Sequence, residues 1–210
     1  MIYIIENESL NENFIEKAKP YLSKQRTDKL MQLKSLKDKI NCCVAFMLLR
    51  YGLYYEYSTV EMPLFDFEKR EKPYLTNISG ISFNFSHCKT AAACIVSKEN
   101  TAIDIMDIRK IKSSVVRRCC SEEEEMRIST STDLDREFIR LWTRKECYVK
   151  YTGIGLLQDF SEITENTPGM NNIHTIEKKH YIMSYYSSYG DCEIIRPDVD
   201  SLFDYIYKKS

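Results

Sequence analysis

The stretch LWTRKECYVK, residues 141–150, says most about the fold of this chain, and it carries the only tryptophan. On an ideal helix, at about 100° per residue, the apolar side chains fall on one side: Phe138, Leu141, Trp142 and Val149. Such a stripe is typical of a helix that faces a core. Glu146 lies at the edge of the same arc, and Lys150 follows one turn later. The segment predicts a core-facing helix bordered by a carboxylate and an ammonium group.

Two interpretations of this charged pair are open. A glutamate followed four residues later by a lysine is a common surface pair, which stabilises a helix by roughly 0.2–0.5 kcal/mol. A buried ionised carboxylate, by contrast, is costly unless a cation receives it. If Glu146 is partly buried, the rest of the chain should supply a metal or a cluster of basic groups.

Composition narrows the class of protein. The 210 residues fit one large domain or two small ones, and 43% hydrophobic with 29% charged residues is ordinary for a soluble globular protein. A net charge of −1 argues against an overall nucleic-acid binder, although local basic patches stay open. The start, MIYIIENESL, lacks the basic region of a signal peptide, and no apolar stretch approaches the ~20 residues of a membrane span. We expect a cytoplasmic monomer with no membrane or nucleic-acid partner.

The eight cysteines do not indicate a metal site. None has the C-x-x-C spacing that favours zinc, and four of them form two adjacent pairs that cannot easily bridge internally. We expect reduced cysteines that serve as small apolar residues.

The remaining pattern predicts a mixed α+β fold. The expected elements are a strand at 2–5, a helix from 14 to about 22, a basic polar segment at 23–29, an apolar helix at 40–51, a loop at 71–74, and strands at 81–87, 91–97 and 101–106. Ser121 begins a helix with four glutamates in its first turns, which we expect to be a solvated helix start rather than a metal site.

The second half repeats the order of the first. A hairpin is expected from strands at 180–188 and 192–196, with its turn at 189–191. Helices followed by a strand pair, twice over, predict two similar α+β halves with a cleft between them. We place these halves at residues 1–100 and 101–210.

Polar residues at strand ends are candidates for chemistry. In TAIDIM (101–106), strand alternation separates Asp104 and Met106 from the neighbouring isoleucines. Asp104 is either a strand-end cap that faces solvent or a ligand for a hard metal such as Mg²⁺. His87 is either an ordinary polar loop residue or, with Ser86 and Lys89, part of a phosphate-binding corner. Further cations that would normally count as surface charge are Arg26, Lys29 and Lys72.

Several motifs together resemble the surfactin-type 4′-phosphopantetheinyl transferases. They are FNFSH (83–87), AIDI (102–105), LWTRKECYVKYTGIGL (141–156) and the upstream pair Lys72-Pro73. The family shows F-N-x-S-H, then G-[IV]-D-[IV]-E, then a W-[ST]-x-K-E-x-x-x-K helix that runs into a glycine-containing loop. The order, spacing and residue types in combination carry the resemblance, which covers most of the chain.

The resemblance implies a two-lobed, pseudo-dimeric fold with the active site between the lobes. It implies that the serine hydroxyl of an acyl or peptidyl carrier protein attacks the β-phosphate of coenzyme A, with Mg²⁺ or Mn²⁺, and releases adenosine 3′,5′-bisphosphate. Asp104 and Glu146 would hold the metal, Glu146 would also accept the serine proton, and Lys150 would contact the diphosphate. The resemblance also implies a coenzyme A site. Ser86 and His87 would contact phosphate, and the 3′-phosphate and adenine would be bound by Arg26, Lys29 and the Lys72-Pro73 loop.

The chain departs from the family pattern at three positions. Met106 stands where a second acidic residue is common, Asn41 stands where the family has an arginine, with Lys39 as a stand-in, and Ala102 replaces a glycine. These departures motivate one alternative, a degenerate homologue that only binds coenzyme A or a carrier. A second alternative sets the resemblance aside and leaves a cytosolic interaction domain with surface charge pairs.

Overall fold

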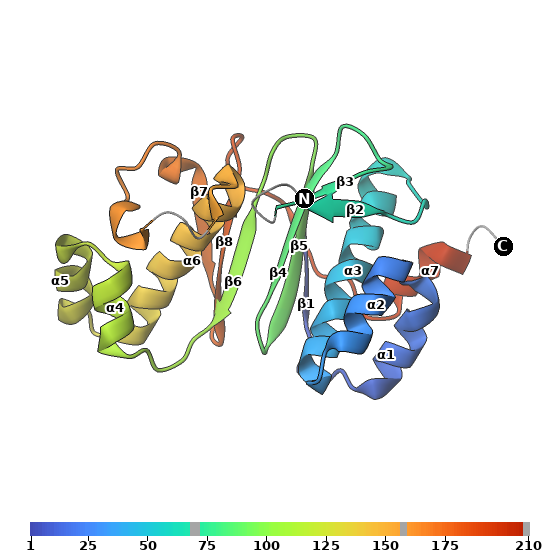
Figure 1. Ribbon diagram of the computed structural model, residues 1–210, viewed down its shortest axis with the longest axis horizontal. Helices are drawn as coiled ribbons and strands as arrows, with labels where there is room; N and C mark the ends of the chain where they lie inside the picture. The colour runs from blue at the N-terminus through green and yellow to red at the C-terminus, as the bar shows by residue number, and fades with distance from the viewer. Residues whose placement is uncertain (68–71, 156–158, 208–210) are drawn as a thin grey trace.

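A computed structural model describes residues 1–67, 72–155 and 159–207. Two sheets dominate it, and each is covered by a long helix (Figure 1). Helix α3 (Leu36–Tyr57) packs against β1 and β5 of one sheet, and helix α6 (Leu134–Thr152) packs against the three strands of the other. The predicted α+β class is confirmed.

The first sheet has the order β4-β5-β1-β9. Its strands are β1 (Ile2–Glu6), β4 (Ser82–His87), β5 (Ala91–Ser97) and β9 (Ile194–Ile195). Strand β5 is antiparallel to both β4 and β1, whereas β9 runs parallel to β1. Helix α3 is apolar on nearly all sides and is buried from Ile40 to Arg50, as expected of a helix inside a core. The chain covers it with α1 (Glu12–Ala18), the 3₁₀ turn η1 (Lys19–Tyr21) and α2 (Lys24–Gln32).

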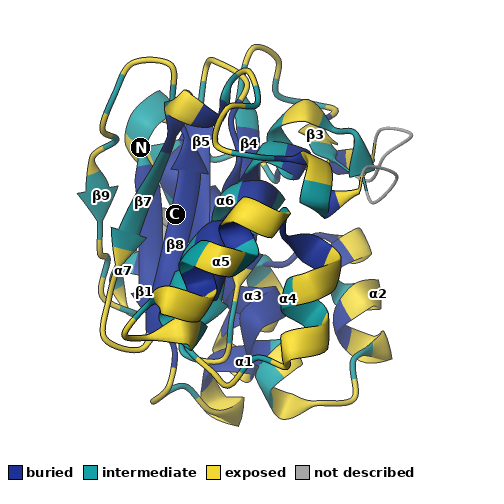
Figure 2. Cartoon of the chain, turned by 90° about the vertical axis from the view of Figure 1, so that its left-hand side faces the viewer, coloured by how far each residue is buried: buried dark blue, intermediate teal, exposed yellow. Residues whose placement is uncertain are grey.

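The second sheet has the order β6-β8-β7, and both of its strand pairs are antiparallel. Its strands are β6 (Ile103–Asp107), β7 (Ile173–Glu177) and β8 (Tyr181–Tyr186). Helices α4 (Ser113–Cys119) and α5 (Glu122–Thr130) lie outside α6 and expose their outer faces, while the strands behind them are buried (Figure 2). The smaller elements are β2 (Phe65–Phe67), β3 (Pro73–Leu75), η3 (Phe160–Glu162), η4 (Met170–Asn172) and α7 (Ser201–Tyr207).

The predicted hairpin between 180–188 and 192–196 is wrong. Strand β8 is already paired on one side with β6 and on the other with β7, so it has no free edge for the later segment. That segment instead supplies β9, in which Ile194 lies opposite Ile2 of β1. The hairpin partner of β8 is β7, whose polar sequence IHTIE gives a weak strand signal.

Two local predictions also change. The basic segment 23–29 lies largely in helix α2, which begins where the Ser23 hydroxyl accepts a hydrogen bond from the Arg26 backbone N–H. In the predicted loop at 71–74, Pro73 and Tyr74 belong to β3, whose only partner among the described strands is β2, a position that tolerates proline. Glu71 lies outside the described residues.

The C-terminal tail returns to the first sheet. Leu202 and Phe203 of α7 are buried in the same core as α3, and the Phe203 ring lies 5.9 Å from that of Phe14. The boundary at residue 100 and the similarity of the two halves stay predictions, although β9 pairs with β1 and α7 contributes Leu202 and Phe203 to the core around α3.

The structure agrees with the expected use of cysteine as a small apolar residue. All eight cysteines are free, and six of them are buried. Within the described ranges, no helix combines the length and apolar character needed to cross a membrane.

Candidate active site

The two sheets meet where β4 lies beside β6 (Figure 1), and side chains rather than a backbone ladder join them. The Asn84 side-chain oxygen accepts a hydrogen bond from the Ile103 N–H at 3.1 Å, and the Ser86 hydroxyl accepts one from the Ile105 N–H at 3.3 Å. Alternate residues of the FNFSH motif thus present oxygens to alternate N–H groups of β6. The contacts fix the register of Asp104, which lies between the two donors.

Asp107 joins the two sheets at the other end of the contact between β4 and β6. Its carboxylate accepts hydrogen bonds from the Lys89 N–H at 2.7 Å, the Thr90 N–H at 3.1 Å and the Thr90 hydroxyl at 2.6 Å. Burial pushes the pKa of Asp107 upward, but these hydrogen bonds outweigh it and leave the pKa below its ordinary value. Asp107 is therefore an ionised structural residue that ties the end of β6 to the β4–β5 turn.

Asp104 forms the centre of a polar cluster between β4, β6 and α6. Its Oδ1 lies 2.6 Å from Lys150 Nζ and accepts a hydrogen bond from the Ser86 hydroxyl at 2.9 Å. Lys150 also donates to Ser86 Oγ and to the Ile103 carbonyl, each at 3.2 Å. Asp104 is only 7% exposed, which rules out the solvent-facing strand cap. The structure brings together Ser86, Asp104 and Lys150 from three separate motifs.

Glu146 lies one helical turn before Lys150 and is half-buried. Burial raises the pKa of its carboxyl, the negative charge of Asp104 raises it further, and Lys150 partly opposes both effects. The surface-pair interpretation of Glu146 and Lys150 therefore does not hold, because both side chains face Asp104. An incoming cation would relieve the repulsion between the two carboxylates.

A cavity of about 340 Å³ opens beside this cluster. Its lining includes Glu146, Lys150, Lys72, Pro73, Phe85 and Phe67. Lys72 donates to the Tyr151 carbonyl at 3.3 Å and to the Asn100 side chain, which holds its ammonium group at the rim. The predicted lysine–proline segment and the predicted metal ligand Glu146 thus share one cavity.

His87 lies at the end of β4 with a different set of neighbours. Its Nδ1 lies 3.2 Å from the Asn41 amide nitrogen, which also donates to the Cys88 carbonyl at 3.1 Å. Loss of solvation lowers the pKa of His87, and the positive charges of Arg26 and Lys150 lower it further. His87 is therefore neutral at pH 7 in the empty protein, and Asn41, in the place of a family arginine, supports its ring.

Arg26 and Lys29 approach His87 from α2. The Arg26 guanidinium is 3% exposed, donates twice to the Cys42 carbonyl at 3.0 and 2.8 Å, and lies over the Phe85 ring at 5.0 Å. Its charge is thus anchored to α3, and burial lowers its pKa. Lys29 lies near enough to contribute to the lowered pKa of His87. The roles predicted for Arg26, Lys29 and His87 in holding the 3′-phosphate stay predictions.

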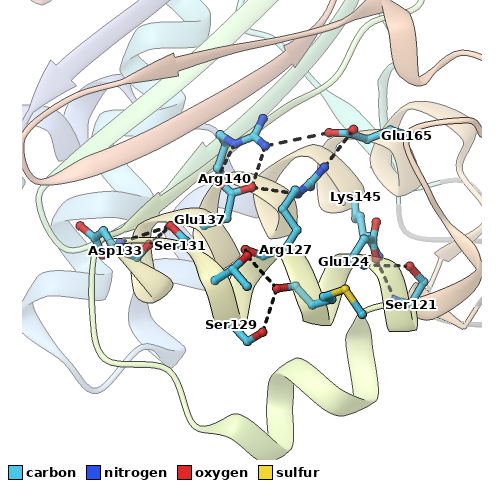
Figure 3. A network of polar contacts seen from close by, with 12 residues as sticks. Ser121, Glu124, Arg127, Ser129, Ser131, Asp133, Glu137, Arg140, Lys145 and Glu165 are labelled. Carbon is cyan, nitrogen blue, oxygen red and sulfur yellow. Dashed lines mark hydrogen bonds and ion pairs between the residues drawn. The ribbon is translucent and has the colours of Figure 1, made fainter.

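Sequence reasoning missed a buried ion pair next to the site. Lys145 is 1% exposed and donates to Glu124 Oε2 at 2.6 Å, to the Phe160 carbonyl at 2.8 Å and to the Cys119 carbonyl at 2.9 Å. Glu124 also closes the capping box of α5 with Ser121 (Figure 3). A signal was present, because Lys145 follows Leu141 by one turn on the apolar stripe.

The expectation of a solvated glutamate run therefore fails for one of its four members. Glu124 is buried, whereas Glu122 and Glu123 are exposed. A surrounding network of Arg127, Glu137, Arg140 and Glu165 holds α5 against α6 and the segment after η3 (Figure 3).

The donor set suits a hard divalent cation. Asp104 and Glu146 supply carboxylate oxygens, which Mg²⁺ prefers, and Mg²⁺ normally completes its shell with water and substrate phosphate. Met106 is partly buried against the second core and offers only a thioether, a poor ligand for such an ion. Across the described residues, no group of three or more histidines, cysteines or carboxylates could hold a metal. The residues present thus fit a metal ion that two protein carboxylates would hold.

Comparison with known proteins gives a consistent result. The family model of the 4′-phosphopantetheinyl transferase superfamily matches residues 101–194. The chain is 27% identical over 153 residues to the 4′-phosphopantetheinyl transferase psf-1 of Bacillus pumilus, covering 71% of this chain and 66% of the relative. It is 34% identical over 100 residues to the 4′-phosphopantetheinyl transferase HetI of Nostoc, covering 44% and 42%.

A further relative is the 4′-phosphopantetheinyl transferase Sfp of Bacillus subtilis, at 24% identity over 159 residues, covering 74% of this chain and 70% of the relative. The chain thus spans slightly less than two thirds of the length of the Bacillus pumilus relative. The residues that the family model matches include the Asp104 strand and the Glu146–Lys150 helix. The chain is therefore similar to surfactin-type 4′-phosphopantetheinyl transferases, and its residues 101–194 match the superfamily model.

Proposed function

We propose that this protein transfers 4′-phosphopantetheine from coenzyme A to a serine of an acyl or peptidyl carrier protein. The observation that carries the proposal is the cluster of Asp104, Glu146 and Lys150 at a cavity whose wall includes Lys72. Two carboxylates and two ammonium groups suit a substrate diphosphate and the divalent cation that accompanies it. The family relatives are named for the same transfer.

In the proposed reaction, the carrier serine oxygen forms a bond to the β-phosphorus of coenzyme A. The bond from that phosphorus to the bridging oxygen breaks, and adenosine 3′,5′-bisphosphate leaves. Glu146 takes the serine proton, directly or through one water, and its raised pKa makes it a better proton acceptor than an ordinary carboxylate. Lys150 stabilises the charge that develops on the diphosphate oxygens.

The remaining residues bind and orient. Asp104 and Glu146 would hold Mg²⁺, or Mn²⁺ in its place, which would supply charge neutralisation at the diphosphate when bound. Ser86 fixes Asp104 and Lys150 through its hydroxyl, so a direct contact with phosphate would require one of these hydrogen bonds to be exchanged. Lys72, Pro73, His87, Arg26 and Lys29 would receive the nucleotide. We place the enzyme in the cytoplasm as a monomer.

A second candidate function is that of a homologue that binds coenzyme A or a carrier without transfer. Met106 and Asn41 favour it, because they remove one carboxylate and one arginine from the family pattern. The retained pair of Glu146 and Lys150 favours the transferase, because simple binding needs no carboxylate of raised pKa beside the diphosphate.

The deciding experiment incubates the protein with coenzyme A, Mg²⁺ and several apo carrier proteins, and uses mass spectrometry to detect a phosphopantetheine adduct. Wild-type protein should modify at least one carrier, and omission of the metal should prevent it. A carrier mutated from serine to alanine at the attachment site is the control. If wild-type protein modifies none of the carriers while Met106→Glu does, the native chain is not this enzyme.

A further inference from the structure

The contact between Lys150 and Asp104 has a consequence for cation binding. The ammonium group lies 2.6 Å from the Asp104 oxygen, with 28% of the lysine side chain and 10% of the aspartate side chain exposed. A charge-assisted contact of this length in a half-buried position is strong, and it neutralises the carboxylate. In the empty protein, the aspartate is thus already paired with a positive charge.

A divalent cation at Asp104 would meet that charge at close range. Two positive groups on one carboxylate repel each other, and the burial of Asp104 weakens screening by water. Glu146 is the one other carboxylate of the predicted metal site, because Met106 stands where a third would lie. Lys150 contacts Oδ1, so an ion at that oxygen would compete with the ammonium group directly, and an ion at Oδ2 would be repelled by it across the carboxylate.

We infer that Lys150 acts as an internal counter-cation that competes with the divalent metal for Asp104 until a phosphate ligand draws it away. The Lys150 ammonium group has an alternative position, because the side chain also lines the cavity that Lys72 and Glu146 border. A diphosphate in that cavity is a better acceptor for the ammonium group than a carboxylate shared with a metal. Metal and phosphate ligand therefore bind with positive cooperativity, and the metal binds weakly when alone.

This inference rests on the proposed function only for the identity of the phosphate ligand. The test is titration of Mn²⁺ by electron paramagnetic resonance, which needs no carrier and no turnover. Lys150→Met should tighten Mn²⁺ binding to the protein alone by about tenfold or more, because it removes the competing charge from direct contact. Lys72→Met is the matched control, since it removes the same charge from the same cavity without a contact to Asp104, and it should change the affinity by less than about threefold.

A second measurement adds adenosine 3′,5′-bisphosphate together with inorganic pyrophosphate as the phosphate ligands. They should tighten Mn²⁺ binding to wild-type protein more than to Lys150→Met, because only the wild type has a competitor to remove. Lys150→Arg, which keeps the charge, should behave as wild type does. Circular dichroism checks that each variant is folded, and Lys150→Gln serves if the methionine variant is not.

Three results would overturn the inference: equal tightening by Lys150→Met and Lys72→Met, weaker Mn²⁺ binding in Lys150→Met, or no binding in either variant. A failure of phosphopantetheine transfer with the expected Mn²⁺ titrations would count against the proposed function alone.

Discussion

Two lysines on helix α6, Lys145 and Lys150, each contact a carboxylate oxygen at 2.6 Å, yet their surroundings differ. Lys145 and Glu124 have side chains that are 1% and 6% exposed, whereas the Lys150 side chain is 28% exposed and borders a cavity. Lys150 also has a second carboxylate nearby, that of Glu146. The comparison teaches that contact distance does not distinguish a structural ion pair from a functional one. The two pairs differ instead in the access of a ligand to the lysine and in the presence of a second carboxylate near it.

The largest expected effect is on stability, at Lys145. Lys145→Met leaves the Glu124 carboxylate buried without its partner, which should lower the free energy of unfolding by about 3–5 kcal/mol. Urea denaturation measures it. The double variant Lys145→Met/Glu124→Gln should recover much of the loss, since it removes the buried charge and keeps a capping oxygen. Lys110→Met, which removes an exposed partner of Asp135, should have no measurable effect. A single variant as stable as wild type would show that the buried pair is not structural.

The corresponding change at Lys150 should affect turnover instead. In the proposed reaction Lys150 stabilises charge on the diphosphate, so Lys150→Met should lower transfer by about 10²–10³-fold. Coenzyme A affinity should fall by a smaller factor, because the contact strengthens in the transition state. Stopped-time mass spectrometry of the carrier and calorimetric titration of coenzyme A give the two numbers. Equal losses in both would reduce Lys150 to a simple binding residue.

A smaller effect is expected at Met106, which lies on the same strand as Asp104. Met106→Glu adds a carboxylate where the family often has one, and it should tighten Mn²⁺ binding in the absence of coenzyme A by about tenfold. The added charge would offset the positive charge of Lys150. Mn²⁺ titration of the variant beside wild type measures the change, and an unchanged affinity would place position 106 outside the metal site.

The smallest expected effect is the dependence of stability on pH at Glu146. Folding raises the pKa of Glu146 above its ordinary value of 4.5. The ionised carboxylate therefore destabilises the folded state, and stability is lost as pH rises from 4.5 through the folded pKa. Glu146→Gln should therefore raise the melting temperature at pH 7–8. The difference should disappear below about pH 4, where Glu146 is protonated in both states. It should also shrink at pH 7 when saturating Mg²⁺ is present. A variant less stable than wild type at pH 7 would contradict the assigned pKa shift.

The α+β class and the positions of the candidate site residues within their elements were predictable from the sequence, whereas the joining of those elements was not. Strand alternation placed Asp104, and helical periodicity placed Glu146 and Lys150, because each pattern depends on the local geometry of one element. The contacts that join these elements could not be predicted from the residues alone. They depend on Ser86, whose hydroxyl forms hydrogen bonds with residues 18, 19 and 64 positions away. The resemblance to a family brought the three motifs together without this physical link.

The failures have a common cause in long-range pairing. Strand β9 has only two residues, and its partner β1 lies at the other end of the chain, so no local pattern could predict it. Glu124 and Lys145 are 21 residues apart on different helices, and each alone resembles an ordinary surface charge. Local propensity identifies most elements, whereas tertiary contacts decide which polar residues become buried.

We propose that Glu146, beside Asp104 and Lys150, accepts the serine proton during phosphopantetheine transfer. The most direct measurement compares wild type with Glu146→Gln in the mass-spectrometric transfer assay, under saturating coenzyme A and Mg²⁺ and with one carrier that wild type modifies. We predict many turnovers for wild type and no detectable adduct for Glu146→Gln, while calorimetry shows that the variant still binds coenzyme A. Transfer by Glu146→Gln at a rate near that of wild type would contradict the account.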